Sequence, residues 1–127
     1  MDEMNLYEYA VIRYVPRVER EEFVNVGLVM MCKRRRWMRA QISVDPRKLG
    51  VYDCAHTPRE IEEQLASFTR LSGVLDKNDP MAGWPVEERF RWLTAVKSSC
   101  LQTSRPHPGK AADLEAAFDR LFAELVL

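Results

Sequence analysis

The amino-acid sequence predicts a single α+β domain over residues 1–127. We expect a three- to four-stranded, mainly antiparallel sheet that begins as an N-terminal meander and is packed by three or so C-terminal helices. Aromatic and β-branched residues dominate three short runs in the first third of the chain, and apolar residues recur at helical spacing in the second half. Strands first and helices after, in 127 residues, are typical of one α+β domain.

The three N-terminal runs predict an antiparallel meander. Residues 6–15, LYEYAVIRYV, are expected to form the first strand, and Pro16 ends it because proline has no N–H for the strand ladder. The second strand is expected over residues 22–32 and the third over 37–44. Residues 33–36, KRRR, fall where a hairpin turn belongs.

Helix signals begin after the third run. Residues 45–49 predict a single helical turn, and Thr57 with Glu60 three positions later forms a capping box that starts a long helix. Pro85 opens the next helix. We expect the helices to cover one face of the sheet.

The C-terminal part holds one more expected helix. Residues 98–104 are a candidate fourth strand, residues 105–110, RPHPGK, are expected to be a rigid loop, and residues 111–127 carry a wide apolar stripe of helical period.

Composition narrows the classes of protein. Lys and Arg number 19, as do Asp and Glu, so no overall charge steers the chain to nucleic acid or anionic lipid. The cysteines Cys32, Cys54 and Cys100 are odd in number and far apart, which favours free thiols over a secreted disulfide framework. The acidic N-terminus lacks the order of a signal peptide, and no apolar run is long enough to span a membrane. We therefore expect a cytoplasmic protein.

The second strand carries two residues that a plain buried strand would not. Strand alternation puts Asn25 and Gly27 on one face together with Val29 and Met31. A buried amide without partners is costly, so Asn25 needs hydrogen bonds. Gly27 leaves a notch, lets another backbone approach, or marks a bulge.

Arg13 of the first strand is the expected neighbour of this amide. A hairpin between the first two strands puts Arg13 opposite Asn25 or Phe23, where it can donate to the Asn25 oxygen or to a carboxylate such as Glu22 or Asp45. Two interpretations stay open. The group is a buried polar network that fixes strand register, or it is a recognition pocket for a backbone or an anion.

Two further segments are candidates. In "LQTSRP", residues 101–106, Gln102 and Ser104 would share a face and could complete the Arg13 network, or the segment is an ordinary exit from a strand. The other segment is the basic hairpin of residues 33–39. It could contact phosphates and stack a base, or be a solvated turn with Trp37 at the sheet edge. Its nucleic-acid candidates are Lys33, Arg34, Arg35, Arg36, Trp37 and Arg39.

Motifs for cofactors, metals and catalysis are not evident. The two histidines, His56 and His107, have no metal-ligand spacing to another His or Cys, and the five glycines form no phosphate loop. We expect no metal, no cofactor and no catalytic residues.

Blocks along the chain resemble a known family. "YAVIRYVPRVEREEFVNVGLVM", "FRWL", "CLQTSRP" and "LFAELV" occur in the order found in the bacterial family called domain of unknown function 3037. The positions that match that pattern are Arg13, Pro16, Glu22, Asn25, Gly27, Gln102 and Ser104. The resemblance implies a small bacterial cytosolic protein without assigned activity, with a HipA-type kinase as a partner.

Three functions follow as hypotheses. The first is a non-catalytic binding or adaptor module that acts through a protein partner at Arg13, Glu22, Asn25, Gly27, Gln102 and Ser104. The second is nucleic-acid binding through the hairpin of residues 33–39. The third is an enzyme with an unrecognised site around Arg13, Glu22 and Asn25.

Overall fold

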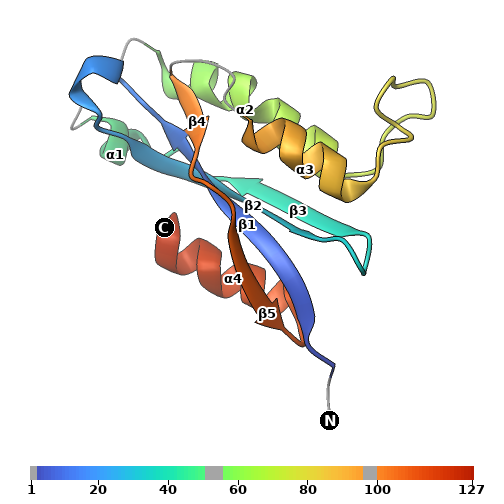
Figure 1. The fold of residues 1–127 in the computed structure, drawn as a ribbon. Helices are drawn as coiled ribbons and strands as arrows, with labels where there is room; N and C mark the ends of the chain where they lie inside the picture. The colour runs from blue at the N-terminus through green and yellow to red at the C-terminus, as the bar shows by residue number, and fades with distance from the viewer. Residues whose placement is uncertain (1–2, 51–55, 96–99) are drawn as a thin grey trace.

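The computed structural model describes residues 3–50, 56–95 and 100–127 (Figure 1). In chain order the elements are β1 (Asn5–Tyr14), η1 (Val18–Arg20), β2 (Val24–Cys32), β3 (Trp37–Ile42), α1 (Pro46–Leu49), α2 (Pro58–Ser72), α3 (Val86–Thr94), β4 (Leu101–Thr103), β5 (His107–Ala111) and α4 (Leu114–Leu125). The chain is thus an α+β protein with the predicted N-terminal meander, β1 to β3.

The sheet is antiparallel in every pairing between its described strands. β2 lies between β3 and β1, and the outer side of β1 is shared by two short strands. β4 pairs with residues 12–14 of β1 and β5 with residues 5–9. The expected fourth strand is confirmed over Leu101–Thr103, whereas residues 98 and 99 of that prediction lie outside the described residues.

β5 occupies the segment that the sequence predicted to be a rigid loop, so that prediction was wrong. Its proline and glycine argue against a strand in general, but an edge strand tolerates Pro108 because its other side needs no partner. Gly109 has a separate reason. A Cβ there would lie 2.3 Å from Cζ of Tyr7, so only glycine lets the two strands pair beneath that ring.

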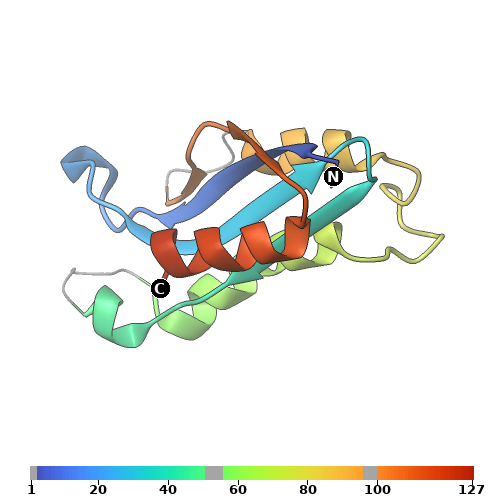
Figure 2. The same cartoon turned by 90° about the horizontal axis from the view of Figure 1, so that it is seen from below.

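Helices cover both faces of the sheet, not one as predicted (Figures 1 and 2). α2 and α3 pack on one face over a core that includes Ile12, Tyr14 and Val29. α4 crosses the other face over a second core that includes Leu28 and Met30. The physical reason is β2 itself: its residues are apolar on both faces, so each face must be buried against a helix.

A bulge in β2 explains why simple alternation misplaced Gly27. Ile12 pairs with Gly27 and the next residue, Arg13, pairs with Asn25, so Val26 is the extra residue on β2. The bulge shifts the faces by one position. Asn25 consequently faces α4, while a Cβ on Gly27 would point at Ile12 on the opposite face.

The starts of α1, α2 and α3 agree with the sequence prediction, whereas the start of α4 does not. The capping box of Thr57 and Glu60 is present at α2, and the Asp45 side chain accepts from the Arg47 N–H at α1. α4 begins at Leu114 and not at residue 111, because the carboxylate of Asp113 caps it by accepting from the third helical N–H. No helix in the described ranges is both long enough and apolar enough to cross a membrane.

Candidate functional site

Arg13, Asn25 and Gln102 form a row across three neighbouring strands. In the register of the sheet Arg13 of β1 lies opposite Asn25 of β2 on one side and opposite Gln102 of β4 on the other. The sequence predicted the first neighbour among two options and suggested the second. The row lies near the C-terminal end of α4, because Asn25 donates a hydrogen bond to the backbone oxygen of Leu125.

Asn25 ties the sheet to the C-terminal end of α4. Its side-chain Nδ2 donates to the backbone oxygen of Leu125 at 2.9 Å, and Nζ of Lys48 donates to the oxygen of Val126. These oxygens belong to the last turn of the helix, which has no internal donors for them. Asn25 therefore has an architectural role, while its Oδ1 is buried and has no hydrogen-bond partner among the described residues.

The Arg13 guanidinium stacks on an aromatic ring. Its Cζ lies 4.1 Å from the ring centroid of Phe23, which is 43% exposed. Nε of Arg13 is buried and, like Oδ1 of Asn25, has no hydrogen-bond partner in the described part of the chain. A buried polar atom left unpaired costs about 1–3 kcal/mol. The two atoms belong to residues that pair across β1 and β2, and together they leave one donor and one acceptor unused.

A pocket of about 340 Å³ opens beside this pair. Phe23, Asn25 and Lys48 line it together with the last residues, 125–127. Its walls are mainly apolar, whereas Lys48 and Asn25 supply polar groups. The arrangement can hold an apolar side chain next to a donor–acceptor pair. We call the residues Arg13, Phe23, Asn25 and Lys48, with residues 125–127, the Arg13 surface.

Two other candidates have structural positions away from the Arg13 surface. Gly27 is packed against β3, since a Cβ would lie 2.9 Å from the Gln41 backbone oxygen, so it leaves no notch. Ser104 is buried between β4 and β5, where its hydroxyl accepts from the Val11 N–H at 2.9 Å.

Glu22 pairs with Arg20 at 2.8 Å. It does not pair with Arg13, and neither does the other carboxylate considered, Asp45, which caps α1. Among the described residues, Arg13 therefore forms neither of the two bonds that the sequence offered, one to the Asn25 oxygen and one to a carboxylate.

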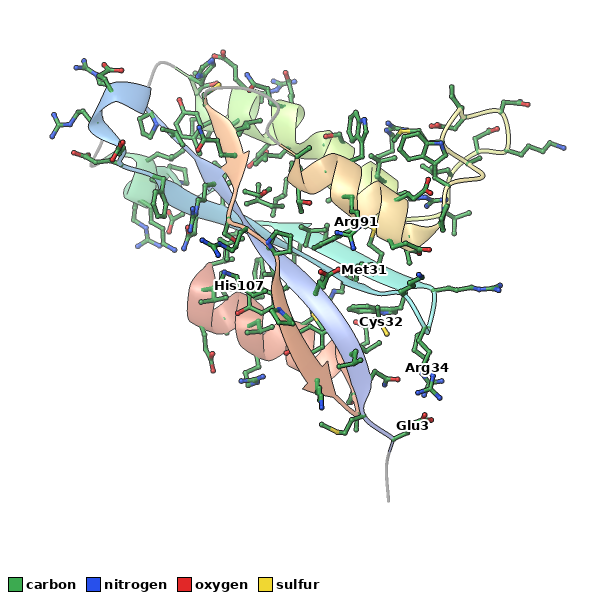
Figure 3. All side chains as sticks on the ribbon, in the orientation of Figure 1. Glu3, Met31, Cys32, Arg34, Arg91 and His107 are labelled. Atoms are coloured by element: carbon green, nitrogen blue, oxygen red, sulfur yellow. The ribbon has the colours of Figure 1, made fainter. Side chains whose placement is uncertain are left out.

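Most cations of the basic hairpin are already paired. Arg34 forms an ion pair with Glu3 of the N-terminal segment, and Figure 3 shows the two side chains pointing toward each other. Nε of Arg35 donates to the buried Asn5 side chain at 3.0 Å.

Trp37 and Arg39 connect β3 to α4. The indole N–H of Trp37 donates to Glu115 at 2.8 Å, and Arg39 contacts both Glu115 at 2.7 Å and Asp119 at 3.0 Å. The Arg39 guanidinium also lies 4.2 Å from the ring centroid of Phe118. Within the described ranges, only Lys33 and Arg36 of this segment have no hydrogen bond or ion pair through their side chains.

The described residues contain no group of three or more His, Cys, Asp or Glu side chains that could hold a metal ion. His56 makes a hydrogen bond of 2.9 Å to the hydroxyl of buried Tyr14, and the exposed His107 lies against the ring of Tyr9. Cys32 is buried and Cys100 half-buried, whereas Cys54 lies outside the described residues.

Sequence reasoning missed two members of the Arg13 surface. Phe23 was considered only as an alternative neighbour of Arg13, yet it provides the aromatic cover of the guanidinium. Lys48 had no signal beyond its place in a single-turn helix, because its contact with Val126 joins segments 78 positions apart.

One protein-family model covers nearly the whole chain. The model of the family described as Protein of unknown function (DUF3037) matches residues 9–126. The chain belongs to this family. The match includes every residue of the row, the hairpin and α4, so the site lies inside the shared domain. Searches among curated proteins and among solved structures found no match.

Proposed function

We propose that this protein is a non-catalytic binding module that recognises an extended peptide segment of a protein partner at the Arg13 surface. The observation that carries the proposal is that two residues paired across β1 and β2 each have a buried atom without a hydrogen-bond partner among the described residues, Nε of Arg13 and Oδ1 of Asn25. A peptide group offers a carbonyl to accept from the arginine and an N–H to donate to the amide oxygen. A single peptide group can therefore satisfy both the arginine donor and the amide acceptor.

The surroundings of the pair support a peptide ligand over a simple anion. An anion would find the Arg13 cation but would face the acceptor oxygen of Asn25, which repels it. The neighbouring pocket gives room for an apolar side chain of the partner, against Phe23 and the exposed Leu127. Phe23 covers the guanidinium, so rotation of this half-exposed ring admits the partner to Arg13.

The partner that the family resemblance suggests is a HipA-type kinase, and we include it in the proposal as the first candidate. The other two hypotheses have less support from the contacts. Three cations of the hairpin are already engaged, and Glu22 is bound to Arg20 instead of lying beside Arg13 as an acid or base.

The test compares variants in capture and in affinity. Tagged wild-type protein and the variants Arg13→Met and Phe23→Ala are used to capture partners from nuclease-treated native lysate, and the captured protein is identified by mass spectrometry. Its affinity for each variant is then measured by calorimetry. Methionine keeps the aliphatic stem of Arg13 and removes the guanidinium. Hydrogen bonds of a charged donor contribute about 1.5–3 kcal/mol, which predicts a loss of about 10- to 100-fold.

Arg47→Met is the matched control, because the Arg47 side chain is 95% exposed on α1. It should bind the partner as the wild type does. Thermal melts of all variants separate binding from folding. An Arg13→Met protein that binds its partner with unchanged affinity, and only melts earlier, would reduce the pair to an architectural feature and refute the proposal.

A further inference from the structure

A groove of about 910 Å³ lies at the other end of β2. The β2–β3 hairpin forms one wall, and the connection between α2 and α3 with the start of α3 forms the other. Figures 1 and 2 place the hairpin tip and this connection at the same end of the molecule. The groove shares no lining residue with the pocket beside Arg13.

Arg89 of α3 holds the second wall in place. Its guanidinium donates to the backbone oxygens of Trp84 at 2.9 Å, Ala82 at 3.2 Å, Gly73 at 3.3 Å and Leu71 at 3.4 Å. These four bonds fix both ends of the connection and use most of the five N–H donors of Arg89. The wall is therefore preformed, and Arg89 serves mainly to hold it together.

Lys33 and Arg36 provide the uncompensated charge of the groove. Both side chains are exposed, line the groove and have no hydrogen bond or ion pair among the described residues. The lining has one acidic residue, Glu87, so the groove carries a net positive charge. Cations without hydrogen bonds or ion pairs on the hairpin wall, opposite the preformed wall, are complementary to carboxylates of a ligand.

Arg36 occupies a backbone position that favours glycine. Its φ is 51°, in the left-handed region, where it closes the hairpin turn by donating its N–H to the Lys33 oxygen at 3.1 Å. An arginine here is conformationally costly, and its side chain makes no hydrogen bond or ion pair with the described residues. A ligand in the groove would supply that contact.

We propose that this groove binds an acidic peptide segment that carries an apolar side chain. Carboxylates of the segment pair with Lys33 and Arg36, and the apolar side chain lies against Trp84 and the fully exposed Val74. The site is separate from the Arg13 surface and adds a second point of attachment. A nucleic acid fits less well, because acidic side chains already neutralise Arg34 and Arg39, so few cations of the hairpin remain for a row of phosphates.

The experiment is a selection of peptides by the immobilised full chain. One displayed library draws its positions from Asp, Glu, Leu, Phe and Trp, and a second replaces the acids with Lys and Arg. We expect enrichment from the acidic library only, with an apolar residue in every family of binders. The most enriched peptide is then labelled, and fluorescence anisotropy measures its affinity for each variant. A labelled single-stranded DNA oligonucleotide is measured in the same way as the competing class of ligand.

Arg36→Gly is the decisive variant, because it removes the charge and relieves the backbone. We expect it to melt at the same or a higher temperature and to bind the peptide about tenfold more weakly. Lys33→Gln should weaken binding likewise, while Arg59→Gln, an equal charge change on exposed Arg59 of α2, and Arg13→Met should not. The proposal is overturned if no acidic peptide is enriched, if Arg36→Gly binds the most enriched peptide unchanged, or if the DNA binds in preference.

Discussion

Ser104→Ala separates an architectural residue from the binding surface. Ser104 is 5% exposed between β4 and β5, and its hydroxyl accepts from the Val11 N–H at 2.9 Å. Alanine removes this acceptor from a buried backbone donor, which costs about 1–3 kcal/mol of the free energy of unfolding. For a domain of this size each kcal/mol lowers Tm by about 3–6 °C.

Urea unfolding followed by tryptophan fluorescence measures the loss. Ser67→Ala on α2 is the matched control, because the Ser67 hydroxyl has no hydrogen-bond partner among the described residues. It should stay within about 0.5 kcal/mol of the wild type. A Ser104→Ala protein as stable as this control would refute the reasoning. A Ser104→Ala protein that is as stable as the wild type but no longer binds the protein partner would also refute it, because the hydroxyl would then act in recognition.

Two further substitutions test local features of the fold. Gly27→Ala places a methyl group 2.9 Å from the Gln41 oxygen inside the bulge, and we expect overpacking to cost about 1–3 kcal/mol in urea unfolding; an unchanged midpoint would mean that β3 does not approach β2 this closely. Thr57→Ala removes the hydroxyl that accepts from the Glu60 N–H at 3.2 Å, and the loss of this cap should cost about 0.5–2 kcal/mol in the same assay. Stability equal to the wild type would argue that water replaces the Thr57 hydroxyl.

The sequence predicted those parts of the fold that depend on local chemistry. The three strands of the meander follow from their β-branched and aromatic runs, and the start of α2 from its capping box, because each signal lies within a few residues of the element it defines. β5 could not be read in this way. Its Pro108 and Gly109 argue for a loop, and only the pairing with β1, about a hundred positions earlier, makes it a strand.

In the candidate site, too, the sequence predicted the contacts between neighbouring segments but not those between distant ones. The approach of Arg13 to Asn25 follows from the short connection between their strands, and it was predicted. Of the three roles considered for Gly27, a bulge and the close approach of another backbone are both found, but the extra residue is Val26, and its place follows only from the pairing of β2 with β1. Partners that come from the far end of the chain, such as Leu125 on Asn25, leave no trace in local sequence.

The divided outer edge beside β1 has a consequence for behaviour in concentrated solution. A long, regular edge strand offers an unbroken row of N–H and C=O groups on which another chain can build. Here the edge has three residues in β4, an interruption at Ser104 and five residues in β5, where Pro108 supplies no N–H at all. Another molecule therefore cannot pair along the whole of this edge, which disfavours the addition of strands that leads to fibrils.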